Sequence, residues 1–404
     1  MVAVAPGEHP MTLIQEKVAQ AVTLLQEFHI PCWLTFVRET QINGDPALPF
    51  LVQANLTWHS ALIVSADGDT RAIVGRYDKR MVEETGAYRE VEGFVEGIKE
   101  PLLRHLQHLA PPAIAINYSK DSEICDGLTH GMYLTLCEYL SEIGYEDRLV
   151  SAEPVLSALR QRKVPAELAR IKDAIRVTEA IFAKVSSFLA PGRTEREAAE
   201  LVHAEVARAG VGYAWEPATC PAVFTGPDTA EAHYGPTGRP IEPGHVVNMD
   251  FGVKVDGYCS DLQRTFYVPE AGEREVPAEV RKGFVTIVRA IERSRAAMRP
   301  GVTGLQVDEV ARQVLLDAGY EAFPHALGHQ VGRFPHDGTA LLGPPWEKYG
   351  RKPFLPLEEG MVFTLEPRLT VPRRGIATVE EMVVVTATGA EYLSTPQTEL
   401  AVVR

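Results

Sequence analysis

The chain has 404 residues, of which 45% are hydrophobic and 23% charged, and its formal net charge is -14. These values are typical of a globular protein, and the length favours two domains over one. The acidic balance argues against a nucleic acid or an anionic membrane as the main partner, because binding to phosphate requires a basic face.

The cysteines are few, scattered and without CxxC spacing, a pattern typical of reduced thiols in the cytoplasm. Residues 1–17 contain no apolar secretory core, and no apolar run approaches the ~20 residues of a membrane helix. We therefore expect a cytoplasmic protein with no membrane partner.

Residues 1–155 predict an α/β domain. Its expected elements are a helix over 11–28, a strand over 31–37, a hairpin over 60–75 around Asp67-Gly68, a strand over 113–119 and a helix near 130–143. This segment contains no catalytic constellation, so we expect it to serve shape, assembly and access to a site elsewhere.

The second predicted domain covers residues 156–404. Pro165 suits the first turn of a long helix that keeps one apolar face. Further on, the sequence repeats itself: 190–210 resembles 299–319 at a constant offset, and each copy opens with a capping box and closes at a glycine.

A matched segment follows each copy of the repeat, "PIEPGHVVNMD" in the first and "PLEEGMVFTLE" in the second. The aligned ends of these segments are Asp250 and Glu366. Two similar α+β halves packed face to face would bring both acids to one seam.

Asp250 lies in an apolar strand, and a hairpin turn is expected at Asp256-Gly257. That turn pairs Asp250 with Gln263 and places Asp261 on the same face. Two buried anions at this distance would raise each other's pKa and destabilise the fold unless a multivalent cation joined them. The alternative is that one of them faces solvent or forms a structural salt bridge.

The second half supplies Glu366 and Glu380, which we expect on consecutive strands around "PRRG". Glu381 would point to the other face, as an ordinary acid. The segment "HALGHQVGRFPHDG" between the acid pairs carries His325, His329 and His336. Its glycines disfavour a long helix, and spacing alone does not select the ligand among the histidines.

Four carboxylates and one imidazole suit two hard or borderline divalent ions, such as Mn, Co, Zn or Fe. Two adjacent ions need bridging carboxylates, and they activate a shared water at neutral pH. The residues therefore predict metal-assisted hydrolysis.

The motifs "NMDFG", "YCSDLQRTF", "HALGHQVG", "TLEP" and "VEEMVVVT" resemble the five ligand motifs of the pita-bread metallopeptidases. This family contains aminopeptidase P, prolidase, methionine aminopeptidase and the metal-free creatinase. The resemblance covers roughly residues 160–404, and the first 155 residues are compatible with the creatinase-type N-terminal domain. It implies an α+β, two-domain fold, with a pseudo-twofold repeat in the C-terminal pita-bread domain.

The resemblance also implies roles for single residues. Asp250 would chelate one metal and His329 the other, while Asp261 and Glu380 would bridge the two. Glu366 would bind the metal on the histidine side and carry a proton from the nucleophilic water to the leaving amine. Three histidines would line the substrate site and stabilise the tetrahedral intermediate: His233, His325 and His336.

The long N-terminal domain and the full ligand set resemble the branch that acts on Xaa-Pro bonds. We expect a homodimeric peptidase with two divalent ions per chain, in family terms Mn, with Zn or Co as alternatives. It would hydrolyse short proline-containing peptides, Xaa-Pro dipeptides first, by attack of a metal-bridged hydroxide.

One position departs from the family pattern. Aminopeptidase P and prolidase commonly carry an arginine two residues before the last glutamate ligand, where this chain has Thr378. Other residues must then recognise the proline side, and the candidates are Arg333, Arg368, Arg373, Arg374 and Tyr392. Three alternatives stay open: an aminopeptidase P acting on longer peptides, a hydrolase of non-proline amides, and a metal-free binding module.

Overall fold

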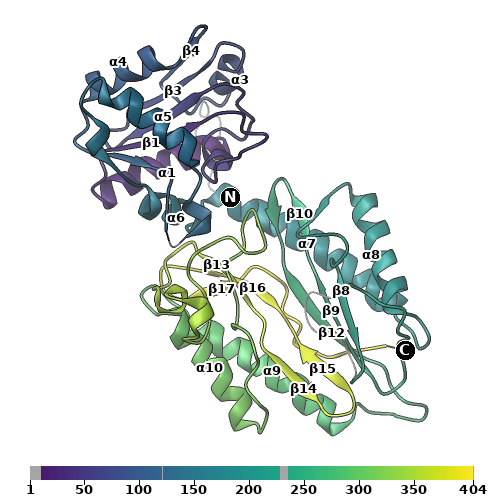
Figure 1. The fold of residues 1–404 in the computed structure, drawn as a ribbon. Helices are drawn as coiled ribbons and strands as arrows, with labels where there is room; N and C mark the ends of the chain where they lie inside the picture. The colour runs from purple at the N-terminus through teal and green to yellow at the C-terminus, as the bar shows by residue number, and fades with distance from the viewer. Residues whose placement is uncertain (1–10, 121, 228–234, 404) are drawn as a thin grey trace, which may run out of the picture. The chain divides into compact units, whose positions relative to one another are not determined.

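The computed structural model describes residues 11–120, 122–227 and 235–403. The chain divides into two compact units, Met1–Arg160 and Gln161–Arg404 (Figure 1). Residue 155, where the sequence predicted the boundary, lies within helix α6 (Glu153–Gln161). Across the described residues, no helix is long and apolar enough to cross a membrane.

The N-terminal unit is built on one mixed sheet with the strand order β4-β3-β2-β1-β5-β6. Its strands are β1 (Cys32–Val37), β2 (Ser60–Ser65), β3 (Thr70–Gly75), β4 (Glu90–Phe94), β5 (Ile114–Ile116) and β6 (Leu149–Ser151). Its other helices are α1 (Leu13–Glu27), α2 (Leu48–Leu51), α3 (Lys79–Glu83), α4 (Lys99–Leu109) and α5 (His130–Ser141). The helices and strands predicted from the sequence are confirmed, although β5 is shorter than expected.

Both faces of this sheet are buried because successive residues of each strand point to opposite sides. In β1, Trp33 and Val37 pack in a core with α1 and α6. Leu34 and Phe36 pack in a second core with α4 and α5. This two-sided burial explains why the strands are nearly continuous apolar runs.

The C-terminal unit combines four helices of at least 14 residues with several small sheets. Its helices are α7 (Pro165–Phe188), α8 (Glu195–Ala209), α9 (Ala278–Ala297) and α10 (Gly304–Asp317). Its strands are β7 (Gly212–Tyr213), β8 (Ala222–Thr225), β9 (Val246–Phe251), β10 (Val253–Val255), β11 (Tyr258–Cys259), β12 (Leu262–Tyr267), β13 (Val362–Leu365), β14 (Arg368–Val371), β15 (Gly375–Thr378), β16 (Glu381–Val385), β17 (Ala390–Tyr392) and β18 (Ala401–Val402). Helix α7 packs on β10 and β11, whereas α9 packs on β14, β15 and α10.

The internal repeat is visible in the structure as two halves, residues 190–267 and 299–385. Thr194 and Thr303 each close a capping box, at the start of α8 and α10. Each threonine also forms an isolated antiparallel bridge with the matched proline of its own half, Pro240 or Pro356. Equivalent residues therefore make equivalent contacts, as the sequence alignment of the halves predicted.

Each half places its acids around an antiparallel pair that ends in a tight turn. In the first half, β9 and β12 pair, and β10 and β11 extend them in the same register. In the second half, β13 and β16 pair, and β14 and β15 extend them. An isolated bridge between Gln263 and Glu380 joins the two halves at a seam.

Candidate metal centre

The first half presents Asp250 and Asp261. Asp250 lies in β9 directly opposite Gln263, which confirms the register predicted from the turn. Asp256 and Gly257 have φ angles of 46° and 81°, as a two-residue hairpin turn of this kind requires. Asp261 was expected inside a strand. It lies instead in a short break between β11 and β12.

The second half presents Glu366 and Glu380. Glu366 directly follows β13 and Glu380 directly precedes β16. The sequence suggested that these two acids lie on consecutive strands. In the structure they do not, because the pair β14 and β15 lies between them in the chain. The "PRRG" segment forms the turn of that pair, and Arg373 adopts a left-handed φ of 65° there.

His329 enters the same region from an irregular segment that lies along β13. Its backbone N–H donates to Thr364 Oγ1 at 3.1 Å, and its carbonyl accepts from the Thr364 N–H at 2.9 Å. Gly328 permits this close approach, because a Cβ there would lie 2.0 Å from the Thr364 carbonyl oxygen. The glycine before the histidine is therefore a packing requirement.

Three of these side chains form a compact group. One possible ligand atom from each of Asp261, His329 and Glu380 lies within 4.8 Å of the other two. His329 Nε2 is 3.8 Å from Asp261 Oδ2 and 3.3 Å from Glu366 Oε1. One imidazole thus faces carboxylates from both halves.

Burial and mutual repulsion dominate the electrostatics of the acids. Burial, and then the charge of neighbouring carboxylates, raises the pKa of Asp250, Asp261 and Glu380 well above the ordinary values. Burial would also raise the pKa of Glu366, but a hydrogen bond from His329 and the charges of three nearby histidines lower it overall. Glu366 is therefore the acid best held in its ionised form.

The residues fit divalent cations. Asp250 Oδ1 and Glu380 Oε2 are buried and have no hydrogen-bond partner among the described residues. Buried carboxylate oxygens without partners carry a large free-energy cost unless a cation compensates them. Several carboxylates with one imidazole are also the ligand types that Mn, Co, Fe and Zn accept.

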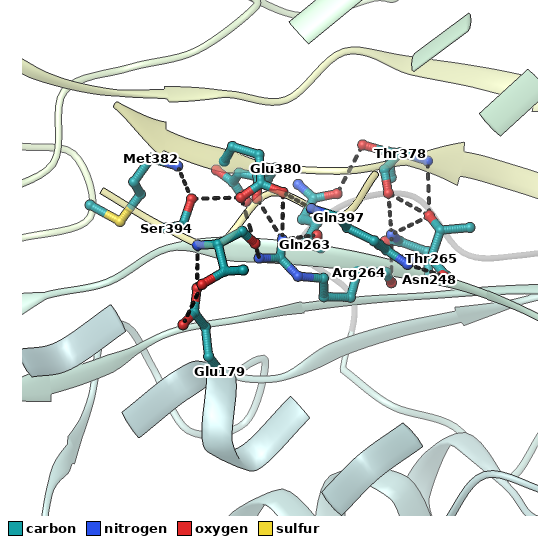
Figure 2. A network of polar contacts seen from close by, with 12 residues as sticks. Glu179, Asn248, Gln263, Arg264, Thr265, Thr378, Glu380, Met382, Ser394 and Gln397 are labelled. Carbon is teal, nitrogen blue, oxygen red and sulfur yellow. Dashed lines mark hydrogen bonds and ion pairs between the residues drawn. The ribbon is translucent and has the colours of Figure 1, made fainter. Parts of the chain in front are cut away.

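A buried polar network contacts Glu380 and its neighbour Glu381 (Figure 2). Arg264 donates to the carbonyl oxygens of Gln263 and Glu380, at 2.9 and 3.0 Å, and forms an ion pair with Glu381 at 3.1 Å. Ser394 donates to the Glu381 carboxylate at 2.6 Å, and the Gln397 N–H donates to it at 2.8 Å. The prediction that Glu381 is an ordinary acid is wrong, since its side chain is only 1% exposed.

Two of the other three predicted histidines, His325 and His336, lie within the described residues. The His336 ring stacks edge-on against His329, with 4.2 Å between ring centroids. His325 and His336 are both near enough to lower the pKa of Glu366 by their charge. His233 lies outside the described residues.

Three of the five candidates for substrate binding are Arg333, Arg368 and Tyr392, and they lie in different places; of the other two, Arg373 lies in the turn described above and Arg374 forms ion pairs with Glu270 and Glu279. The Arg333 guanidinium lies over the ring of Tyr258, 5.2 Å from its centroid. The Tyr392 hydroxyl donates to Glu292 of helix α9 at 3.0 Å. Arg368 differs from both, because it is the direct cross-strand partner of Thr378, next to the acids.

Sequence reasoning missed Gln263, Arg264 and Thr364 as parts of the site. Gln263 Nε2 donates to Glu366 Oε2 at 3.3 Å, and Thr364 Oγ1 donates to Glu366 Oε1 at 3.3 Å. For Gln263 a signal existed, since it lies two residues after Asp261 and opposite Asp250. The contacts of Arg264 with Glu380 and Glu381 span more than 100 residues, so local patterns did not reveal them.

Comparison with known proteins places this geometry in a family. Residues 169–387 match metallopeptidase family M24, which is more than half of the chain. The chain belongs to this family of metallopeptidases.

Relatives and solved structures agree with this assignment. "Probable dipeptidase PepE" of Mycobacterium tuberculosis is 34% identical over 256 residues, which are 63% of this chain and 64% of that protein. The chain thus spans just under two thirds of the length of that relative. The "Xaa-Pro dipeptidase" of Pyrococcus furiosus is 27% identical over 275 residues, 68% of this chain and 74% of that protein.

The fold is similar over almost the whole chain. The crystal structure of dipeptidase PepE from Mycobacterium ulcerans aligns with a TM-score of 0.68 and 28% identity, covering 98% of this chain and 100% of that one. The predicted fold class, a two-domain α+β protein with a pita-bread catalytic domain, is confirmed.

Proposed function

We propose that this protein is a dinuclear-metal peptidase that hydrolyses the Xaa-Pro bond of short peptides, with Xaa-Pro dipeptides as the first substrates. The observation that carries the proposal is the buried group of Asp261, His329 and Glu380, whose ligand atoms converge within 4.8 Å. Family membership supports the chemistry, and the names of the two curated relatives support a dipeptidase.

Five residues would hold two divalent cations: Asp250, Asp261, His329, Glu366 and Glu380. When bound, such cations supply positive charge that polarises a peptide carbonyl and lowers the pKa of water. Asp261 and Glu380 are suited to serve both cations, because Asp261 faces His329 as well as the charge of Asp250.

Glu366 would carry the proton. Its carboxylate lies 3.3 Å from His329 Nε2, and the charges of three histidines lower its pKa, which favours the form that accepts a proton from the attacking water. The same carboxylate then delivers this proton to the leaving amine. His325 and His336 lie beside it and would donate hydrogen bonds to the substrate oxygen that gains charge.

Arg368 is our candidate for the group that binds the free carboxylate of a dipeptide. Residues directly opposite each other on paired strands project to the same face. The next pair, Leu369 and Ala377, belongs to the hydrophobic core, so Arg368 and Thr378 face away from that core. Thr378 contacts Gln263 on this face, and this contact supports our assignment of Arg368 to the edge of the cluster.

A substrate panel tests the proposal. Metal-stripped protein is reconstituted with Mn, Co or Zn and assayed on Ala-Pro, Ala-Pro-Ala and Ala-Ala. We expect metal-dependent release of proline from Ala-Pro. A site that binds a free carboxylate directly after a tertiary amide bond excludes the other two peptides. Equal rates on Ala-Ala would refute the proline assignment.

Replacing Arg368 with alanine sharpens the test. A charge-assisted hydrogen bond contributes roughly 1.5–3 kcal/mol, so we expect KM for Ala-Pro to rise about 10- to 100-fold. Ala-Pro amide, which lacks the carboxylate, should be affected little. An equal effect on both substrates would remove Arg368 from substrate recognition.

An aminopeptidase acting on longer peptides is the second candidate. A "Putative Xaa-Pro aminopeptidase" of Mycoplasma pneumoniae is also a relative, 28% identical over 286 residues. Cleavage of Ala-Pro-Ala at a rate similar to Ala-Pro would favour this candidate, because it requires a site open on the leaving side.

The remaining expectations belong to the same proposal. Manganese as the native metal and a homodimer rest on resemblance to the family. The cytoplasm as location is supported by five free cysteines, as in reducing compartments. We assign catalysis to residues 156–404, and shape, assembly and access to the site to residues 1–155.

A further inference from the structure

A chain of directed hydrogen bonds runs from Thr378 through Gln263 to Glu366, and Figure 2 shows Thr378 and Gln263. Thr378 Oγ1 donates to Gln263 Oε1 at 3.1 Å, and Gln263 Nε2 donates to Glu366 Oε2 at 3.3 Å. The Gln263 carbonyl oxygen also accepts from the Glu380 N–H at 3.2 Å. Gln263 therefore contacts both acids of the second half, Glu366 through its side chain and Glu380 through its backbone.

The chemistry of the groups fixes the direction of this chain. An ionised carboxylate only accepts hydrogen bonds, so the Gln263 nitrogen must face Glu366. The amide oxygen then faces Thr378, and only a hydroxyl that donates satisfies it. Gln263 and Thr378 are 8% and 4% exposed, so water is a poor substitute for either partner.

The backbone around both residues is held in place by other contacts. The Thr378 carbonyl oxygen accepts from Asn248 Nδ2 at 2.8 Å and from Thr265 Oγ1 at 2.5 Å. The Arg264 guanidinium donates to the Gln263 carbonyl oxygen. The backbones from which the Thr378 hydroxyl and the Gln263 amide project are thus both held by hydrogen bonds.

We propose that Gln263 and Thr378 act together as positioning residues of the metal centre. The Thr378 hydroxyl holds the Gln263 amide, the amide nitrogen holds the Glu366 carboxylate, and the Gln263 backbone holds that of Glu380. In this role Thr378 serves the metal ligands and does not read the substrate. The inference rests on the proposed metal-dependent function and extends it to two residues beyond the ligands.

The first experiment measures metal binding and not activity. Metal-free wild-type protein, Thr378→Val and Thr378→Ser are titrated with Mn²⁺ by calorimetry. Loss of an outer partner of a ligand typically weakens metal affinity about 10- to 100-fold, so we expect this loss in Thr378→Val. Thr378→Ser keeps the hydroxyl and should bind like the wild type. The matched control is Thr370→Val, an exposed threonine of β14.

A double-mutant cycle with Gln263→Met separates positioning from general packing. If Thr378 acts through Gln263, adding Thr378→Val to Gln263→Met should not weaken Mn²⁺ binding further. Independent effects that multiply would overturn the proposal, as would wild-type affinity in Thr378→Val. If Thr378→Val does not fold, Gln263→Asn withdraws the amide by one methylene and should lose the same affinity.

Kinetics provide a second, independent readout. Thr378→Val should lower kcat on Ala-Pro while the ratio of kcat/KM between Ala-Pro and Ala-Ala stays within about twofold of the wild type. A changed ratio would show that position 378 reads the substrate. Wild-type protein that binds no Mn²⁺ would refute the proposed function and this inference together, whereas wild-type binding with an unaffected Thr378→Val refutes the inference alone.

Discussion

Asp261 lies close to possible ligands from the second half of the repeat. Its carboxylate lies 3.8 Å from His329 Nε2, forms a ligand group with Glu380, and is raised in pKa by burial and by the charges of Asp250 and Glu366. A ligand shared by two cations stabilises both, so its loss should release both.

We therefore expect Asp261→Ala to lose both metal ions together. Metal content per chain after dialysis, measured by atomic emission, checks this expectation. Asp147→Ala, at an exposed site of the N-terminal unit, is the control and should keep the wild-type content. Retention of one or both ions by Asp261→Ala would contradict a bridging role.

Glu366 should matter mainly in the transition state, because its proposed task is to move a proton. Glutamine keeps the shape of the side chain and removes the proton acceptor. Loss of a general base typically costs about 10²- to 10⁴-fold, so we expect kcat of Glu366→Gln to fall by this amount with little change in KM. A variant with a raised KM and an unchanged kcat would exclude the role.

At the scale of elements, the buried ion pair of Arg264 and Glu381 connects β12 to β16. Both side chains are nearly inaccessible, at 9% and 1% exposure. Removing one member leaves a buried charge without its partner, which typically costs about 3–5 kcal/mol, whereas replacing both members by apolar residues costs much less.

We therefore expect Glu381→Gln to lower the free energy of unfolding of the C-terminal unit more than the double replacement of Arg264 and Glu381 by methionine. Urea denaturation of both variants measures the difference. If the double variant lost as much free energy of unfolding as Glu381→Gln, or more, the two side chains would contribute independently. Metal affinity should fall in the double variant, because Arg264 also donates to the Glu380 carbonyl oxygen.

The elements that sequence predicts well are those whose signals are local. Asp256-Gly257 fixed the turn, the turn fixed the pairing of Asp250 with Gln263, and the capping boxes marked the starts of α8 and α10. Alternation along a strand also told correctly that Glu380 and Glu381 face opposite sides. It did not predict that Glu381 pairs with a buried arginine, because Arg264 is 117 positions away in the sequence.

The pair β14 and β15 shows a second limit. The sequence placed Glu366 and Glu380 on consecutive strands, since both flank one turn. The structure interrupts β13 after Leu365, at the Glu366-Pro367 step, and begins a separate pair with Arg368. Proline cannot donate to a strand ladder, which accounts for the break. The position of Arg368 opposite Thr378 follows from this arrangement.

At the scale of the whole molecule, the two units have separate cores and separate ionisable groups. The N-terminal unit contains a buried carboxylate, Asp45, which accepts from the Ala47 N–H at 2.8 Å and from Asn117 Nδ2 at 2.9 Å. Burial raises the pKa of Asp45 from 3.8 to about 6, against the opposing effect of these hydrogen bonds.

This shift makes the N-terminal unit sensitive to pH. The folded state keeps a proton on Asp45 that the unfolded state releases between pH 4 and pH 6, so the free energy of unfolding falls as the pH rises through this window. The loss is at most about 3 kcal/mol for a shift of this size. Asp45→Asn does not titrate and should flatten the slope, as thermal unfolding between pH 4 and pH 7 would show. An unchanged slope would assign the effect to other groups.

The seam between the two halves has a consequence for dividing the chain. Asp250 and Asp261 come from residues 190–267, whereas His329, Glu366 and Glu380 come from residues 299–385, and the linking stretch around Ala271 and Gly272 is exposed. A protein cut there would consist of two fragments, each with an incomplete set of the proposed ligands. Hydrolysis could then arise only from reassembled pairs. The catalytic domain is for this reason a natural split reporter, in which metal-dependent turnover signals that two polypeptides have met.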